Sequence, residues 1–380
     1  MTDESASTAS GTVYTGDRLE RFIPISKAEI FDDLLTHGSL SEPQKDGFRQ
    51  LVTILGALYH YQFHSDLERL KNAYGPFSPD SDNVVTRKWT EEELLEKRKS
   101  FLSGIGKILD DANYEPLTAE DINVALKAAS PYGLSLFVDL SGFDEMLLFC
   151  RGAAVQVEWR RTWTKLWLGR AKHEIPIYKR LALVLKLKPE TDLRAEIKER
   201  LGLEEAKAAK VARRRRSGVT RAMREEAIYL KLFRDIPRCD LEMLFPNTQV
   251  RMNLFDKVKI GATGSGATGM ALFKVFATAF TLNPLAFATA LFGLVMTLWY
   301  QAAKVFNLRT RYMITLSQNL YFHNLDNNAG VFTHLIDLAE EEECKEAILA
   351  YYFLLTEADQ RYSPESLDRR IEEYVAERYG

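Results

Sequence analysis

The 380-residue sequence has only three cysteines, and they lie far apart. Cys150, Cys239 and Cys344 show neither a CxxC spacing nor a Cys/His spacing. This argues against a disulfide framework and against a zinc module, both of which need clustered ligands. The cysteines are therefore expected to be free thiols in a reducing compartment.

The first twenty residues lack the features of a targeting segment. They carry Asp3, Glu4, Asp17 and Glu20, only Arg18 as a base, and no apolar core. A secretory signal needs an apolar core, and a transit peptide is rich in Arg and poor in acids. The sequence predicts neither of these. Because Ser, Thr, Gly and Ala dominate residues 1–16, we interpret them as a disordered tail.

The formal net charge of −3 provides no global attraction to nucleic acid or anionic lipid, so any such attraction must be local. The segment from Lys207 to Arg224 holds eight bases and no acid. Near anionic lipid each base contributes about 1 kcal/mol, which favours binding to an anionic surface. Nucleic acid is the less favoured alternative, and a solvated linker remains open. The eight bases are Lys207, Lys210, Arg213, Arg214, Arg215, Arg216, Arg221 and Arg224.

Charge is nearly absent from Ile260 to Ala303, where Lys274 is the one charged residue in 44. That length suffices for two helices of roughly 20 residues across a bilayer. The sequence therefore predicts a membrane-embedded helical hairpin at residues 257–304. Lysines and arginines on both flanks predict cytoplasmic termini, as in a multi-pass protein of a bacterial inner membrane. The alternatives are a re-entrant wedge or a hairpin buried in a protein core. The hairpin residues singled out are Gly266, Met270, Lys274, Asn283, Pro284, Trp299 and Tyr300.

Periodicity elsewhere indicates an α+β fold. Thr90 with Glu93, and Thr118 with Asp121, are typical of residues that open helices. Short β-branched or aromatic runs after Gly133 predict an antiparallel sheet, and Tyr312–Leu316 resembles a strand. We expect a helical region at residues 17–132, an antiparallel sheet at 133–188, and a charged helix with a basic linker at 189–256. The membrane hairpin at 257–304 follows, and residues 305–380 are expected to form a strand and helices that pack on the N-terminal portion.

Two motifs suggest chemistry without establishing it. Gly264, Gly266 and Gly269 fit G-x-G-x-x-G, but no acid follows until Asp326 and no βαβ pattern surrounds them, so we expect no nucleotide cofactor there. His60 and His64 lie one helical turn apart. Together with Asp80 and Asp82 they are candidate ligands for a metal ion. The simpler interpretation is that the histidines are partly buried on a helix and that the aspartates stabilise a turn.

No catalytic constellation emerges, and we expect no cofactor. The leading hypothesis is a structural or scaffolding membrane protein, with the lipid bilayer as partner and self-association through the Gly/Ala-rich helix. The alternatives are a membrane-tethered enzyme or metal-binding protein, and a peripheral protein that binds anionic lipid or nucleic acid through the basic run.

Several strings resemble a family of membrane proteins known as domain of unknown function 3754. The clearest are Phe233–Pro246 and Asn319–Gly330, followed by Arg21–Ile25, Tyr74–Asp82 and Glu343–Tyr352. The family includes bacterial and plant members and a mammalian mitochondrial transmembrane protein. The resemblance implies two transmembrane helices between soluble parts, and it supplies no catalytic residue.

Overall fold

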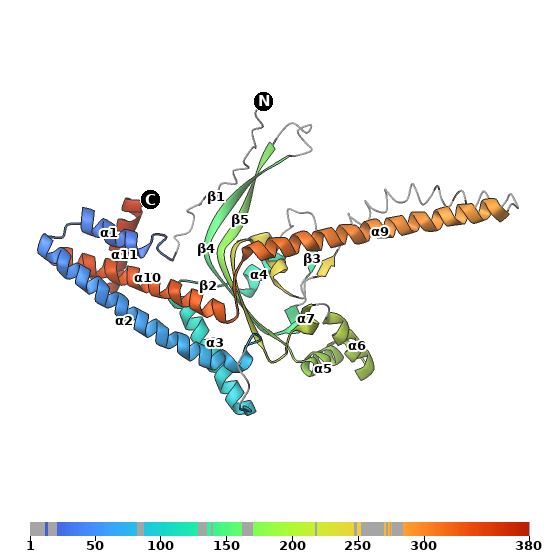
Figure 1. The fold of residues 1–380 in the computed structure, drawn as a ribbon, viewed down its shortest axis with the longest axis horizontal. Coiled ribbons are helices and arrows are strands. Elements are labelled where there is room, and N and C mark those ends of the chain that lie inside the picture. Colours follow the sequence, from blue (N-terminus) through green and yellow to red (C-terminus); the bar gives the residue numbers. More distant parts are fainter. Residues whose placement is uncertain are drawn as a thin grey trace.

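The computed structural model describes most of the chain. The described residues are 12–13, 21–81, 87–127, 135–137, 140–161, 170–216, 219–246, 249–251, 270, 273, 275 and 284–379. They form an α+β fold in which an antiparallel sheet carries helices on both faces (Figure 1). One long helix extends away from the rest.

Helices from both ends of the chain form one helical body at one side of the sheet (Figure 1). Its helices are α1 (Lys27–His37), α2 (Glu42–Tyr74), α3 (Glu91–Asp111), α10 (Ala329–Thr356) and α11 (Pro364–Tyr379). The remaining helices are α4 (Ala119–Lys127), α5 (Glu190–Leu201), α6 (Glu205–Arg215), α7 (Val219–Ala222) and α9 (Pro284–His323). Short 3₁₀ turns are η1 (Gly75–Phe77), η2 (Leu140–Gly142) and η4 (Arg238–Leu244).

The main sheet has six antiparallel strands in the order β1-β4-β5-β6-β8, and β2 also pairs with β4. A separate pair joins β3 to β7. The strands are β1 (Thr12–Val13), β2 (Glu115–Pro116), β3 (Ser135–Phe137), β4 (Phe143–Arg161), β5 (Arg170–Leu187), β6 (Ile228–Pro237), β7 (Gln249–Arg251) and β8 (Asn324–Asn327).

The central strand β5 is apolar on both sides because protein covers both faces of the sheet. Ala182 and Val184 face the core shared with α2, α3 and α10. Leu181, Leu183 and Leu185 face a second core with α4 and η4. A strand buried on both faces reads as a near-continuous apolar run, which explains its weak alternation in sequence.

The helix starts follow local chemistry. Thr90 Oγ1 accepts from Glu93 N at 3.2 Å, and Glu93 Oε2 accepts from Thr90 N at 2.9 Å, which closes the predicted capping box. Thr118 and Asp121 cap α4 in the same reciprocal way. These pairs satisfy backbone N–H groups that a helix leaves without partners, so the predicted starts of α3 and α4 are confirmed.

The α+β class with an antiparallel sheet is confirmed, but the membrane-embedded hairpin is wrong. Among the described residues, none of the helices combines the length and the apolar character needed to cross a membrane. The helix that begins at Pro284 continues through Lys304, Arg309 and Arg311 to His323 without a break. The second half of the apolar run, from Pro284, is thus part of a longer, mixed helix. This finding overturns the transmembrane assignment and the multi-pass inner-membrane placement that depended on it.

The same helix changes the C-terminal prediction. Tyr312–Leu316, expected as a strand, lies inside α9. The expected boundary between residues 304 and 305 also falls within this helix. The strand that pairs with the sheet is the next segment, Asn324–Asn327, which joins β6.

A buried carboxylate ties the helical body to the sheet. Glu342 on α10 is 2 % exposed, and it accepts from Arg151 of β4 at 2.8 Å, from Lys345 at 3.0 Å and from the backbone N–H of Ile23 at 3.1 Å. Lys345 also donates to the Ile23 carbonyl at 3.1 Å and lies 3.3 Å from Glu341. A buried charge is tolerated when it is paired and hydrogen-bonded in this way.

Replacement of Glu342 by Gln should destabilise the fold strongly, because Arg151 would remain buried without its anion and Lys345 would keep only Glu341. Loss of one partner of a buried pair costs about 3–5 kcal/mol. Denaturant unfolding followed by circular dichroism measures the change, with the exposed Glu373→Gln as the matched control. Equal stability of the two variants would contradict the assigned role of Glu342.

A second charged contact links the N-terminal and C-terminal helices. Asp33 of α1 accepts from Arg378 Nε at 2.9 Å and from the hydroxyls of Tyr374 and Tyr379 at 3.1 Å each. The hydrogen bonds from Arg378, with those from Tyr379 and Tyr374, hold the pKa of the Asp33 carboxyl well below its usual range, while burial opposes this shift.

This contact predicts a pH-dependent part of the stability. A carboxyl whose pKa is lowered by folding stabilises the protein above its unfolded pKa of about 3.9, and the contribution is lost as the pH falls further. Asp33→Asn should therefore cost about 1.5–3 kcal/mol at pH 7, the usual value for a charged hydrogen bond. Its deficit relative to wild type should shrink below pH 4, as measured by urea unfolding at pH 7, 4 and 3. The exposed Asp46→Asn is the control, and a deficit independent of pH would contradict this account.

Candidate functional site

The outer half of α9 carries an exposed apolar face. Its side chains are Leu285 at 75 % exposure, Phe292 at 67 %, Val295 at 56 %, Met296 at 50 % and Trp299 at 72 %. At 100° per residue these five fall within an arc of about 100°, which is the width of a helix face that normally contacts a partner. We call these five residues the α9 face. Leu285, Phe292 and Trp299 follow one another at seven-residue spacing, as in helices that pack side by side.

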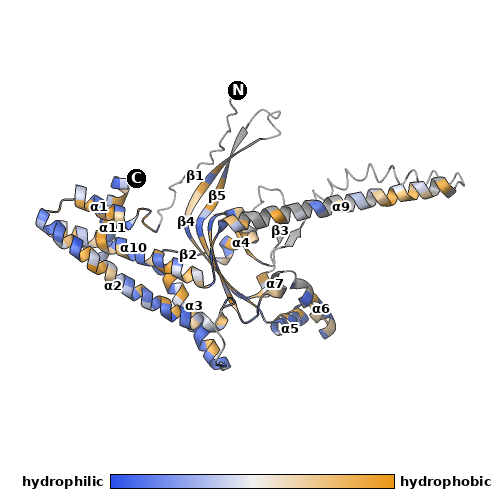
Figure 2. Ribbon diagram, viewed as in Figure 1, coloured by the Kyte–Doolittle hydropathy of each residue, from blue (hydrophilic) through white to orange (hydrophobic). Residues whose placement is uncertain are grey.

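The opposite side of α9 differs. Ala290, Leu294 and Thr297 are half-buried, and Thr297 Oγ1 donates to the Gly293 carbonyl at 2.7 Å. Farther along the helix, the exposed side is mixed: Asn307 and Thr310 are polar, whereas Ile314 is 52 % exposed and Tyr321 77 % exposed. In the described part of α9, exposed apolar side chains are therefore concentrated on one side of the outer half of the helix, and a few others follow near its anchored end (Figure 2).

The sheet anchors α9 at its other end. His323, the last residue of α9, contacts the Arg234 carbonyl through Nδ1 at 2.8 Å, and Leu320 packs on the core that includes η4. From this anchor the 40-residue helix extends about 60 Å, at 1.5 Å per residue (Figure 1). The α9 face thus projects well beyond the sheet.

The residues assigned to the hairpin are only partly described. Met270, Trp299 and Tyr300 are exposed at 67 %, 72 % and 71 %. Pro284 is the first residue of α9. Gly266, Lys274 and Asn283 lie outside the described residues, as does the glycine-rich motif from Gly264 to Gly269. Trp299 belongs to the α9 face, and Tyr300 lies beside it.

The basic run is helical rather than an extended linker, and part of its charge is neutralised internally. Arg216 pairs with Glu225 and donates to the Lys188 carbonyl, while Lys207 lies 3.3 Å from Glu204. In the part of the run that the structure describes, four bases are exposed: Lys207, Lys210, Arg213 and Arg224. The side chains of Arg214, Arg215 and Arg221 lie outside the described part of the chain. Anionic-surface binding by this run stays a prediction, with fewer charges available to it.

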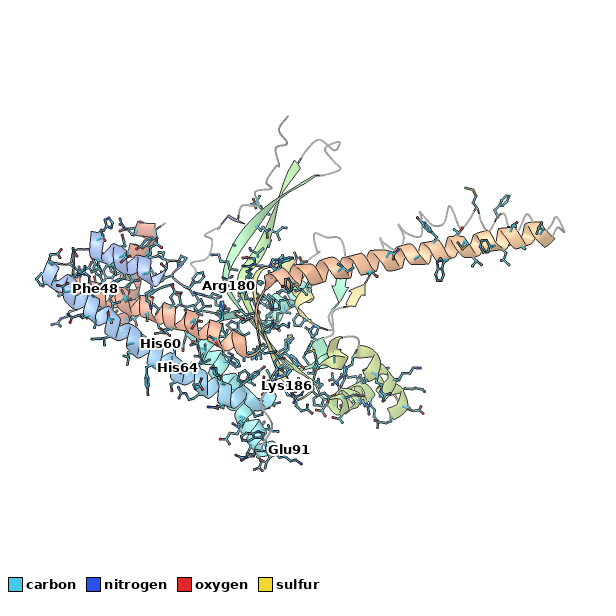
Figure 3. The ribbon with its side chains drawn as sticks, viewed as in Figure 1. Phe48, His60, His64, Glu91, Arg180 and Lys186 are labelled. Carbon is cyan, nitrogen blue, oxygen red and sulfur yellow. The ribbon has the colours of Figure 1, made fainter. Side chains whose placement is uncertain are left out.

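The candidate metal residues are not brought together. His60 and His64 stack on α2 with ring centroids 6.2 Å apart (Figure 3), but His60 Nδ1 contacts Glu340 of α10 at 3.1 Å. Asp80 instead accepts from the Asn328 side chain, at the end of β8, and Asp82 lies outside the described residues. Within the described ranges no group of three His, Cys, Asp or Glu has the arrangement of a metal site.

His60 does line an open cleft of about 410 Å³ between the start of α1, α2 and α10. Glu340, Glu341 and Asp337 form its acidic side, and Lys27 contributes the opposite charge. Glu341 Oε1 accepts from the Lys27 backbone N–H at 3.4 Å, where a carboxylate favours the start of α1. His334 of α10 contacts Asp326 at 3.2 Å and does not line the cleft. The cleft is polar and wide open, so its contacts are explained by helix packing.

The buried partners on α10 were missed in the sequence, where Glu340–Glu343 looks like a solvated acidic segment. A helical signal was nevertheless present. Glu342 lies seven residues from both Leu335 and Leu349, which are fully buried, so it falls on the core face of the helix. Lys345, three residues later, supplies the compensating charge on that face.

Comparison with known proteins identifies the family. Residues 143–330 match the family model described as "Protein of unknown function (DUF3754)". The match begins at the first residue of β4 and takes in β5, β6, α9 and β8. It is narrower than the resemblance in the sequence, which also included segments on both sides. No solved structure matches the chain. The chain belongs to the family of unknown function DUF3754.

Proposed function

We propose that the protein is an assembly protein whose α9 face binds the same face of a second copy. The observation that carries this proposal is the α9 face itself: five large apolar side chains on one arc, each at least half exposed. Apolar area removed from water contributes about 25 cal/mol per Å², so such a face favours association.

The exposed area suits a dimer. From the exposed fractions, the α9 face offers about 700 Å² per copy, or roughly 1,400 Å² for two, within the usual range for stable interfaces. Aromatic and methionine side chains are typical of the centre of such interfaces. Phe292 and Trp299 therefore supply the anchors, with Val295 and Met296 between them.

The chemistry of the face favours a second copy as its partner. From Pro284 to Ala303 the helix contains no charged residue, so nothing on it selects a charged partner. A two-fold interface requires only that a patch be complementary to itself, and an uncharged apolar stripe meets that condition. Seven-residue spacing also lets two helices keep the same side in contact over several turns.

The anchor of α9 is compatible with this role. Because its C-terminal end is held at β6 and β8, two copies paired along the outer half of α9 would keep their sheets and helical bodies apart. The proposed assembly is therefore a spacer in which two folded bodies are joined by paired helices.

The test uses Phe292→Asp/Trp299→Asp in the full chain. Two charges at the centre of the interface should raise the dissociation constant of the dimer at least a hundredfold, because buried aromatic anchors each contribute about 2 kcal/mol or more. Sedimentation velocity over a range of concentrations measures it. The matched control is Ile54→Asp/Tyr61→Asp, which changes two exposed apolar residues at the same spacing on α2.

A wild-type chain that remains monomeric at all concentrations would overturn the proposal. So would an association that the α2 control weakens as much as the α9 variant does. Flotation with lipid vesicles serves as a further arm, since vesicle binding by a monomeric wild type would mean that something other than a second copy covers the face.

A further inference from the structure

Three arginines stand side by side across the sheet. Arg151 of β4 pairs in register with Arg180 of β5, and Arg180 pairs with Arg234 of β6. Residues directly opposite in antiparallel strands place their side chains on the same face, with Cα atoms about 4.5–5.5 Å apart. The three side chains thus form one row, about 10 Å from end to end at the backbone.

The row lies on the face that packs against the helical body. Ala182, two residues from Arg180, and Leu232, two residues from Arg234, both belong to the core shared with α2, α3 and α10. In Figure 3 Arg180 is seen beside the sheet on the side of these helices. Exposure increases along the row, from buried Arg151 through half-buried Arg180 to exposed Arg234. One end is therefore open to solvent.

The positive charge of the row is only partly balanced. Arg151 forms an ion pair with Glu342, but the same carboxylate also forms an ion pair with Lys345. The polar contact of Arg180 is with the Lys179 carbonyl at 3.3 Å, and neither Arg180 nor Arg234 forms an ion pair with a described residue. Like charges placed directly opposite one another destabilise a sheet. An external anion bound between Arg180 and Arg234 would remove this repulsion.

A second observation points to the same place. The Tyr114 hydroxyl and Arg151 Nε are buried donors that lack a hydrogen-bond partner, and Tyr114 is 1 % exposed. Tyr114 immediately precedes β2, whose first residue pairs with Cys150, so it lies next to Arg151. Burial raises the pKa of Tyr114 to about 12, against the opposing effect of the nearby Arg151 and Arg180. The hydroxyl therefore keeps its proton as a donor at neutral pH.

The aromatic ring of Phe22 covers this end of the row. The Arg151 guanidinium lies 4.3 Å from its centroid and Lys179 Nζ lies 5.5 Å from it. A ring stacked on a guanidinium holds its plane without using its N–H groups. Arg151 Nη2 already donates to Glu342, and Nε remains available for a further hydrogen bond.

We propose that the arginine row, together with the Tyr114 hydroxyl, binds a phosphate monoester. Two guanidinium groups without carboxylate partners match the charge of about −1.5 to −2 that a phosphate monoester carries at pH 7. The planar fork of arginine donates two parallel hydrogen bonds to phosphate oxygens. A carboxylate carries only one charge and would leave the second arginine unbalanced. This site is independent of the α9 face.

Isothermal titration of the full chain with inorganic phosphate tests the proposal, with acetate at equal ionic strength as the comparison. Wild type should bind phosphate at least tenfold more tightly than acetate. Arg180→Gln/Arg234→Gln should weaken phosphate binding at least tenfold. Arg361→Gln, an exposed arginine that also lacks a described ion pair, should leave it unchanged. If the double variant fails to fold, Arg234→Gln alone decides, since Arg234 is exposed.

Tyr114→Phe separates binding from folding. Because it removes a buried hydroxyl that has no partner, stability without phosphate should not fall. Phosphate affinity should nevertheless drop several-fold, and the rise in melting temperature caused by phosphate should shrink accordingly. Glycerol 3-phosphate and vesicles carrying phosphatidate, compared at equal phosphate, then show whether the group comes from a small molecule or a lipid. Absence of phosphate binding, equal binding of acetate, or binding unaffected by the arginine variants would overturn the proposal.

Discussion

The rest of the structure depends on one buried carboxylate, that of Glu342. A carboxylate at 2 % exposure requires hydrogen-bond donors on every side, and here they come from β4, from α10 itself and from the segment before α1. Ile23 and Glu342 are separated by 319 positions in the chain. The cost of leaving the charge unpaired therefore holds the two ends of the chain together and holds both against the sheet. The contacts of Glu342 fix how the helices and the sheet are positioned. Apolar packing around Tyr74, Phe101 and Phe332 then adds stability to that arrangement.

The two proposed sites meet on strand β6. His323, at the anchored end of α9, contacts the carbonyl of Arg234, whose side chain ends the arginine row. Arg151, at the other end of the row, is a partner of Glu342. One line of contacts thus runs from the helical body across three strands to the base of α9. An anion bound on the row and a partner bound on α9 would act on the same strand, although nothing in the geometry requires that either binding depends on the other.

Local structure could be predicted from the sequence, but the packing partners of each helix and strand could not. Thr90 with Glu93 and Thr118 with Asp121 revealed helix starts, because a cap depends only on residues three positions apart. The antiparallel sheet followed from β-branched runs separated by glycine. The membrane hairpin was wrong because apolar composition does not say where a helix ends. The helix from Pro284 continues through basic residues that had been assigned to a flank. Segment 189–256 was interpreted as a charged helix and linker, yet it supplies β6, whose ladder partners lie in distant parts of the chain.

The arginine row could not be predicted from the sequence for a different reason. Arg151, Arg180 and Arg234 are separated by 29 and 54 residues, and each is an ordinary strand residue when considered alone. Only the register of β4 against β5 and of β5 against β6 makes them neighbours, and a shift of one residue would move a side chain to the other face. Here the register is fixed by burial on both faces of β5 and by the bond from Arg151 to Glu342. The contact that stabilises the fold therefore also holds three like charges side by side, and it neutralises only the innermost of them.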